Sequence, residues 1–367
     1  VDSIRMAAMR HVSSPRLLGV RMPIQRMPRV LACASACTSI GDAARAASSE
    51  AIRVSIPDLQ TNAVDRCLEY DMSLYTPIDV PGVGKIGCVC SPVAEALAAH
   101  PSVFHVDLQT QLVTMRRELD TFEKRTEAMV DVANDLKARG FLGKWRDELF
   151  PATMGFDDEP AFAVERAVVS LLGLRGYGVH ANGLVRDESA PGGYRLWVGR
   201  RAADKATWPG KLDHLAAGGQ PLGLDPYVNM VKECGEEAGI PPELCEKGLH
   251  AAGAVSYRLG ETHTRMVDGA SKGVATATEV HTLKRDVLFV YDLELPADFT
   301  PVPVDGEVES FELMDLQTVV NLIAETEEFK PNVALVIVDM LVRRGIVTAE
   351  SKGYLKLIKS LRLIDCA

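Results

Sequence analysis

Apolar residues recur at helical spacing in the first part of the chain and at strand spacing in the second. Between Arg116 and Ala138 they follow one face of a helix, and the pattern stops at Gly140, a residue type that often ends helices. The patterns of the first part predict a helix over Val93–His100, a strand over Val103–Val106, and helices over Arg116–Ala138 and Ala161–Leu172. Residues 56–139 are therefore expected to form a small α+β unit.

From Tyr177 onwards, runs of β-branched and aromatic residues lie between turns that contain Gly and Pro, which is typical of strands. Strands are predicted over Tyr177–Val185, Tyr194–Arg200, His250–Arg258, Arg285–Leu295 and Glu307–Met314. Helices are predicted over Pro226–Ala238, Leu316–Ala324, Asn332–Arg343 and Glu350–Leu361. A mixed sheet flanked by helices is the simplest architecture for this order of elements. The polar segment Gly260–Thr282 is expected to be a tolerated disordered insertion, with a substrate lid as the alternative.

Charge is distributed unevenly along the chain. The whole sequence has 40 Lys and Arg against 50 Asp and Glu, and its net charge of −10 argues against binding to nucleic acids or anionic membranes. Residues 1–56 nevertheless hold eight Arg, no Lys and three acidic residues. This composition predicts a disordered transit peptide over residues 1–50, and hence import into a plastid or mitochondrion. The alternative is a disordered tail without a targeting function, on a protein that stays in the cytoplasm.

Two further observations exclude classes of protein. The longest aliphatic run, Val333–Val338, is too short to cross a bilayer, so no membrane partner is expected. The eight cysteines include no pair with zinc-binding CxxC spacing, so we expect free thiols rather than a metal site.

The segment Gly218–Ile240 carries the most informative chemistry. Within its predicted helix, Glu233, Glu236 and Glu237 are spaced i, i+3 and i+4, which places three carboxylates on one face. Their mutual repulsion would be relieved by a divalent cation, and carboxylate oxygens suit Mg²⁺ or Mn²⁺. Spacing alone also fits a solvated acidic helix face, so both interpretations stay open at this point.

The same segment resembles the Nudix box, G-x5-E-x7-R-E-U-x-E-E-x-G-U, where U is a bulky apolar residue. Leu224 replaces the first Glu of the pattern, and Lys232 replaces its Arg. In the family those two side chains mainly support the loop and helix rather than bind the metal. The matching residues are Gly218, Glu233, Cys234, Glu236, Glu237, Gly239 and Ile240.

The resemblance extends over about 300 of the 367 residues. It points to a eukaryotic branch that includes plant plastid-targeted Nudix hydrolases and fungal thiamine pyrophosphokinase-related proteins, all with an extra N-terminal domain. The N-terminal part contributes the motif Trp145–Leu149. Seven later segments are similar to this branch: Tyr177–Gly183, Leu196–Arg201, Trp208–His214, Gly253–Tyr257, Lys284–Phe289, Tyr291–Pro296 and Asp305–Phe311.

The resemblance implies an α+β protein in which a Nudix α/β/α sandwich with a mixed sheet follows a small α+β domain. The implied divisions are an accessory domain at 57–165, a Nudix domain at 175–330, and C-terminal helices at 331–367 that pack on it. The implied activity is Mg²⁺-dependent hydrolysis of thiamine diphosphate, preferably of its oxidised oxo- and oxy-forms, to the monophosphate. The alternatives are hydrolysis of ADP-ribose, NADH or an isoprenoid diphosphate, or metabolite binding without catalysis. The partner is a small-molecule diphosphate, and no oligomeric state is predicted.

Site residues follow from the resemblance and from residue chemistry. The matched box implies metal-binding and catalytic roles for Glu233, Glu236 and Glu237. A carbonyl of Gly218 or Gly219 is expected to complete the metal site, because glycine permits close backbone approach. Late acids of the family suggest Glu307, with Glu309 on the same strand face, as a ligand or base. Candidate substrate-binding residues are the cations Arg200, Arg201 and Lys211 for phosphate and the aromatic residues Trp208 and Tyr257 for a ring.

Overall fold

The computed structural model describes residues 52–205, 207–268 and 275–362. The described residues belong to one compact unit. The predicted transit peptide lies outside the described residues. Among the described helices, none is long and apolar enough to cross a membrane.

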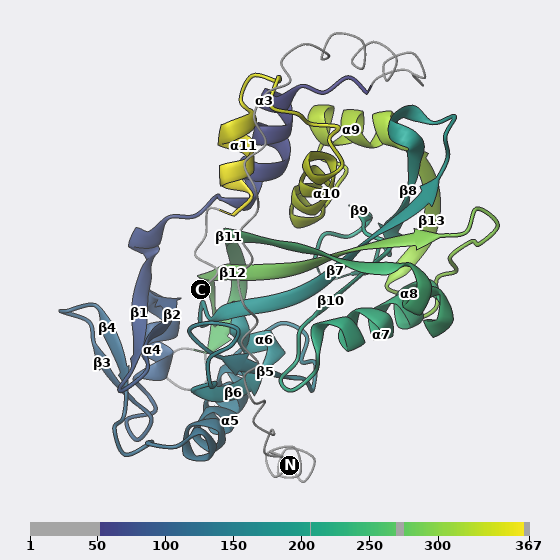
Figure 1. Cartoon of the computed structure of the whole chain (residues 1–367). Helices are drawn as coiled ribbons and strands as arrows, with labels where there is room; N and C mark the ends of the chain where they lie inside the picture. Colours follow the sequence, from purple (N-terminus) through teal and green to yellow (C-terminus); the bar gives the residue numbers. More distant parts are fainter. Residues whose placement is uncertain (1–51, 206, 269–274, 363–367) are drawn as a thin grey trace, which may run out of the picture. The chain divides into compact units, whose positions relative to one another are not determined.

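A mixed seven-stranded sheet forms the centre of the described unit (Figure 1). Its strands are β7 (Arg175–Arg186), β8 (Tyr194–Arg201), β9 (Leu212–Asp213), β10 (Ala216–Gly219), β11 (Leu249–Asp268), β12 (Ala275–Leu295) and β13 (Val308–Asp315). The main path is β11-β12-β7-β8-β13, with β10 beside β7 and β9 beside β8. β7 pairs in parallel with β12 and antiparallel with β8 and β10. β7 is buried except at its last residue, as expected for a central strand covered on both faces.

Helices cover both faces of this sheet (Figure 1). They are α7 (Pro226–Ala238) and α8 (Pro242–Gly248) on one face, and α9 (Leu316–Glu325) and α10 (Pro331–Arg343) on the other. Strand β8 shows how the alternation of side chains divides the core. Leu196 and Val198 lie in the hydrophobic cluster of α9 and α10, whereas Trp197 lies in that of α7 and α8. The predicted α/β/α sandwich with a mixed sheet is confirmed.

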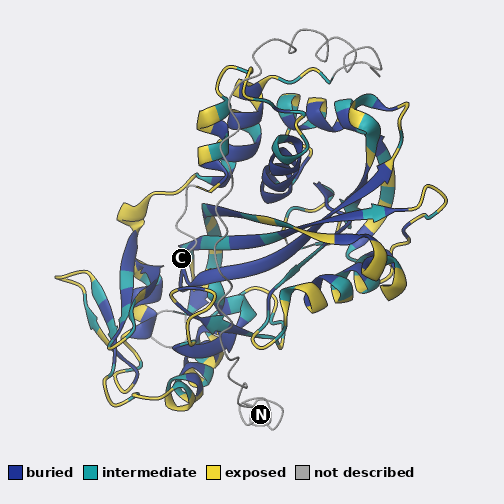
Figure 2. Cartoon of the chain, viewed as in Figure 1, coloured by how far each residue is buried: buried dark blue, intermediate teal, exposed yellow. Residues whose placement is uncertain are grey.

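The N-terminal region forms a smaller layered structure with its own hydrophobic cluster (Figure 2). Its four-stranded sheet has the order β2-β1-β4-β3. Val267 and Val280 of the β11–β12 hairpin are buried in the same cluster, so this hairpin joins the region to the sandwich. The elements are β1 (Tyr75–Val80), β2 (Gly84–Cys90), α4 (Ser91–Leu97), β3 (Phe104–Asp107), β4 (Leu112–Met115), α5 (Phe122–Ala138), β5 (Leu149–Ala152), β6 (Phe162–Glu165) and α6 (Arg166–Val169).

Short helical elements complete the described unit. They are α3 (Ile56–Leu59), η1 (Gln60–Val64), η2 (Asp65–Cys67), η3 (Met72–Leu74), η4 (Pro191–Gly193) and α11 (Tyr354–Ser360). Ile56, Leu59 and Val64 lie in the core of the sandwich together with Leu357 of α11. The segment before β1 therefore packs with the C-terminal helices.

Two predicted helices of the N-terminal region differ from the structure. The helix expected over Ala161–Leu172 is wrong, because residues 162–165 form strand β6, which pairs with β5, and only Arg166–Val169 is helical. Tertiary strand pairing here overrides local helix propensity. Helix α5 starts at Phe122 rather than at residue 116, because the Thr121 side chain caps it by accepting from the Lys124 amide at 3.3 Å.

The segment Gly260–Thr282 is not a disordered insertion over its described residues. Residues 260–268 and 275–282 extend β11 and β12 as paired antiparallel strands, up to the pair of Asp268 with Ala275. Many polar side chains of this segment face solvent, whereas Val267 and Val280 are buried in the hydrophobic cluster of the N-terminal region.

Candidate functional site

Helix α7 carries the acidic residues and has well-defined ends. Asp225 caps it by accepting hydrogen bonds from the amides of Tyr227 and Val228, and Pro226 occupies its first turn. Gly239 ends it in the left-handed conformation with φ of 63°. These bounds are the predicted ones. They set Glu233 and Glu237 one turn apart on the side that faces β10.

Strand β10 holds both carboxyl groups in place. The amide of Ala217 donates a hydrogen bond to Glu237 Oε2 at 2.8 Å. Next to it, Gly218 leaves room for the Glu233 carboxyl group, which a Cβ at this position would overlap. The group that lies close to the Gly218 backbone in this structure is therefore the Glu233 side chain. A carbonyl of Gly218 or Gly219 as metal ligand stays a prediction.

Glu237, Asp305 and Glu307 form a cluster of carboxylates. Oxygen atoms of the three side chains lie within 4.8 Å of one another. Burial raises the pKa of Glu237 well above its usual value, and the charges of Asp213, Glu233 and Glu307 add to this, although the bond from the Ala217 amide opposes it. A hard divalent cation fits this donor set, because it would bind carboxylate oxygens and remove the cost of ionising the half-buried Glu237.

Glu233 and Glu236 have different surroundings on the same helix. Burial raises the pKa of Glu233, against the charge and hydrogen bond of Lys232. Glu236 is exposed and accepts a hydrogen bond from Lys232 Nζ at 2.7 Å, while the same Nζ lies 3.2 Å from Glu233 Oε1. Lys232, which stands at the position of the family's Arg, thus connects two acids of the box.

The acids open into a cavity of about 1030 Å³. The chain segments around this cavity come from α7, β7, β10, the β11–β12 hairpin and the N-terminal region. Predicted site residues that line it are Gly218, Glu233, Glu236, Glu237, Glu307, Trp208, Tyr257 and Arg201. Most of the site residues predicted from the sequence therefore line the same cavity.

Arg200, Lys211 and Glu309 do not line the cavity. Arg200 donates to the carbonyl oxygen of Gly210 at 2.8 Å and lies 3.6 Å from Glu328. Lys211 Nζ donates to the carbonyl oxygen of Glu327 at 2.6 Å. Glu309 is exposed, because a β-bulge between Val308 and Ser310 breaks the alternation that was expected to align it with Glu307.

Asp305 and Asp286 are among the acids of the cavity that were missed from the sequence. Asp305 precedes Glu307 by two residues, and its Oδ1 accepts the Glu307 amide at 2.8 Å, so the turn between them places both carboxylates together. Asp286 accepts a hydrogen bond from the Tyr257 hydroxyl at 2.5 Å. The spacing Asp-x-Glu before a strand was the available signal for Asp305, whereas only the pairing of β11 with β12 brings Asp286 to Tyr257.

A buried polar network lies behind the acids. His180, which lines the cavity, and His214 place their Nδ1 atoms 2.8 Å apart. Burial lowers the pKa of His214 to about 4, and burial and the charge of His214 lower that of His180. Asp213 pairs with Arg201 at 2.7 Å and with Lys330 at 3.5 Å. Arg201 is therefore held by an internal ion pair.

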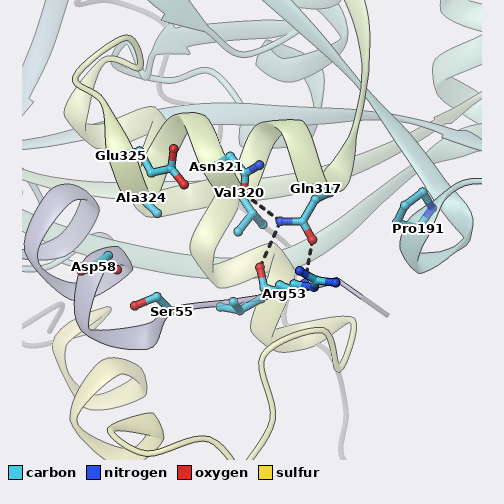
Figure 3. A pocket seen from close by; sticks show the side chains of 10 residues that line it. Arg53, Ser55, Asp58, Pro191, Gln317, Val320, Asn321, Ala324 and Glu325 are labelled. Atoms are coloured by element: carbon cyan, nitrogen blue, oxygen red, sulfur yellow. Dashed lines mark hydrogen bonds between the residues drawn. The ribbon is translucent and has the colours of Figure 1, made fainter. Parts of the chain in front are cut away.

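A second cavity, of about 630 Å³, lies between the segment that begins at Arg53 and helix α9 (Figure 3). Gln317 crosses it: its Oε1 accepts from the Arg53 amide at 2.6 Å, and its Nε2 donates to the Arg53 carbonyl oxygen at 3.1 Å and to Asn321 Oδ1 at 2.8 Å. The Gln317 side chain thus holds the backbone of Arg53 through hydrogen bonds to both its N–H and its C=O group. Its role is structural.

Comparison with known proteins places the chain in a family. Residues 60–176 match a family described as "Domain of unknown function (DUF4743)". The chain is 43% identical over 255 residues to "Nudix hydrolase 20, chloroplastic" of Arabidopsis thaliana, covering 70% of this chain and 62% of that protein. It is 42% identical over 255 residues to "Nudix hydrolase 24, chloroplastic" of the same plant, covering 70% and 64%.

A yeast protein matches over more of its length. The chain is 35% identical over 282 residues to "Uncharacterized protein YJR142W" of Saccharomyces cerevisiae, covering 75% of this chain and 76% of that protein. The chain belongs to the Nudix hydrolase family, in the eukaryotic branch with an extra N-terminal domain, as its sequence predicted. It spans less than two thirds of the length of the two plant relatives.

Proposed function

We propose that this chain is a divalent-metal-dependent diphosphatase, with Mg²⁺ as the metal and Mn²⁺ as a substitute. The observation that carries the proposal is the cluster of Glu237, Asp305 and Glu307 at the wall of a large cavity. Box residues Glu233 and Glu236 lie beside it on α7. A protein that only binds a metabolite has little reason to keep so many carboxylates together, because their repulsion costs stability.

The acidic residues of the cavity and Lys205 have different proposed roles in the reaction. Glu237, Asp305 and Glu307, with Glu233 one turn before Glu237, would hold the cation. When bound, a divalent cation screens phosphate oxygens and acidifies a water molecule. Glu233 would accept a proton from the attacking water through a carboxylate oxygen that is not bound to the cation. Lys205, which lies 2.5 Å from Glu307 Oε2, would fix that acid during the reaction.

The proposed substrates are thiamine diphosphate and, preferably, its oxidised oxo- and oxy-forms, which would lose phosphate to give the monophosphate. An aromatic side chain supports this choice, because the half-buried Trp208 lines the cavity and offers a surface for a heterocycle. Tyr257 also lines the cavity, but its ring is buried in the core of the sandwich. Trp208 adopts a left-handed backbone with φ of 53°, and its carbonyl oxygen accepts from Arg201 Nε at 3.1 Å. Such an uncommon conformation at a cavity wall is consistent with a functional constraint.

A second candidate is hydrolysis of ADP-ribose or NADH. The observation that favours it is the size of the cavity, about 1030 Å³, which is at the upper end of the range for small-molecule sites and leaves room for a dinucleotide. As to location, the chloroplastic names of two relatives favour import into a plastid over a mitochondrion.

The test uses the purified full chain with Mg²⁺ and five compounds: thiamine diphosphate, its oxo- and oxy-forms, ADP-ribose and NADH. Phosphate release is followed for the first three, and product chromatography for the last two, which yield two monophosphates. Preference for the oxidised thiamine diphosphates supports the proposed substrate. Turnover of the nucleotides alone replaces it with the second candidate, and absence of turnover on all five supports a binding module without catalysis.

A further inference from the structure

We propose that the N-terminal region supplies two phosphate-binding arginines, Arg146 and Arg166, to the cavity of the Nudix sandwich. Both lie within residues 60–176, the part that matches a domain of unknown function, and both line the cavity. The inference rests on the proposed diphosphatase function and names the residues that would hold the diphosphate of the substrate. It gives this region a part in the reaction beyond packing.

The region is attached directly to the loop that precedes the acidic helix. The amide of Leu222 donates a hydrogen bond to the carbonyl oxygen of Leu149 in β5 at 2.9 Å. The ring of Phe150 in the same strand lies so close to Gly219 that a Cβ at Gly219 would come within 2.7 Å of it. A backbone hydrogen bond and a tight packing contact connect β5 to this loop. Side chains next to β5 therefore have a fixed position relative to the acidic residues of α7.

Arg166 stands beside the box. Its Nη1 donates to Glu148 Oε2 at 2.8 Å, and its guanidinium carbon lies 5.6 Å from the centre of the Phe150 ring. It also lies next to the Gly219 backbone, and its positive charge opposes the rise in the pKa of Glu233. One bond to Glu148 orients the guanidinium and leaves several of its five N–H donors for a ligand.

Arg146 stands near the other acids. Its amide donates to Glu165 Oε1 at 2.8 Å, which fixes its backbone. Its positive charge contributes, after that of Lys205, to lowering the pKa of Glu307 against the effect of burial. Within the part of the chain that the structure describes, its guanidinium makes no hydrogen bond or ion pair, so it is available to an anion.

Several of the other cations that line the cavity are already paired with acids. Lys205 lies 2.5 Å from Glu307, Lys232 lies 2.7 Å from Glu236, and Lys330 lies 3.5 Å from Asp213. A diphosphate that approaches the acid cluster needs further positive charge, and the planar guanidinium binds two phosphate oxygens at once. Arg146 supplies that charge near Glu307, and Arg166 supplies it near Glu233.

The test measures binding of methylenediphosphonate, a diphosphate mimic that resists hydrolysis, to the full chain with Mg²⁺ by titration calorimetry. Arg146→Gln and Arg166→Gln are each expected to weaken binding at least about tenfold, the value of one charge-assisted hydrogen bond. Arg117→Gln is the matched control, because Arg117 lies in the same region, is exposed and does not line the cavity. It should change binding less than about twofold.

Affinity for Mn²⁺, measured by electron paramagnetic resonance, separates phosphate binding from a structural role. The inference predicts unchanged or tighter Mn²⁺ binding in both variants, because each loses a positive charge near a cation site. Wild-type affinity for methylenediphosphonate in both variants, or a parallel loss of Mn²⁺ affinity, overturns the inference while the proposed function stands. Absence of binding to the wild type contradicts both. Where a Gln variant fails to fold, Arg146→Met or Arg166→Met, which also removes the positive charge, decides by the same criteria.

Discussion

Gly218 and Glu233 lie so close together that a Cβ on Gly218 would overlap the Glu233 carboxyl group. Gly218 belongs to a strand that pairs with Val179, and Glu233 belongs to a helix that packs on this strand, so neither backbone is free to withdraw. The glycine at the start of the box therefore serves packing between strand and helix, and it fixes the position of the Glu233 carboxylate.

Gly218→Ala should displace Glu233. Because the added methyl group meets a carboxyl group in a packed region, we expect a loss of about 1–3 kcal/mol in the free energy of unfolding and at least about tenfold weaker Mn²⁺ binding. Gly235→Ala is the control: it lies inside α7, and the nearest other atom to its added Cβ is 3.7 Å away. That variant should gain about 0.5–1 kcal/mol. Wild-type Mn²⁺ affinity in Gly218→Ala would refute the proposed position of Glu233.

Asp305→Asn should weaken metal binding although the Nudix box is intact. A neutral amide replaces one of three clustered carboxylates, so Mn²⁺ affinity should fall by about tenfold or more. Glu309→Gln removes the same charge four residues later from an exposed side chain outside the cavity, and should leave the affinity unchanged. Equal effects of the two substitutions would mean that overall charge, and not coordination, sets the affinity.

Glu237→Gln should stabilise the metal-free protein at alkaline pH. The folded protein holds the Glu237 proton more tightly than the unfolded chain, since burial raises the pKa. Stability is therefore lost as pH rises above the unfolded value of 4.5, and the variant avoids that loss. Thermal unfolding in chelator should show a higher midpoint for the variant at pH 8 and none of this gain at pH 4.5. A destabilised variant at pH 8 would argue against a buried ionisable acid here.

Acidification should destabilise the protein through the buried histidines. Burial lowers the pKa of His214 from 6.5 to about 4, although Asp213 and Asp292 oppose this. The unfolded chain therefore binds more protons between these values, and stability falls as pH drops from 6.5 towards 4. His214→Gln should flatten this part of the curve measured by denaturant unfolding. If the free energy of unfolding of His214→Gln depends on pH as steeply as that of the wild type, groups other than His214 take up the protons on unfolding.

The sequence predicted the sandwich well because its elements are strongly patterned. The bounds of α7 are as predicted, since Asp225 with Pro226 starts the helix and Gly239 ends it by local chemistry. Strand β6 was missed, because Phe162–Glu165 becomes extended only by pairing with β5. Strands β5 and β6 have four residues each, which is too short for a clear strand period in the sequence.

The site was predicted in its helical part and incompletely elsewhere. Glu233, Glu236 and Glu237 share one helix, so their spacing alone brings them together. Asp305 reaches Glu237 through a turn before β13, and Arg146 and Arg166 arrive from a different layer of the molecule. Such neighbours depend on tertiary packing. For the same reason Arg200 and Lys211, chosen by residue type, lie outside the cavity.

The most direct test of the proposed function is turnover of oxothiamine diphosphate by the full chain after treatment with chelator and stepwise return of Mg²⁺. The cluster around Glu237 predicts that chelation abolishes phosphate release, that Mg²⁺ restores it, and that Glu237→Gln releases phosphate at least about a hundredfold more slowly at every Mg²⁺ concentration. Hydrolysis that survives the chelator, or a Glu237→Gln variant that is as active as the wild type, would contradict a catalytic metal at this cluster.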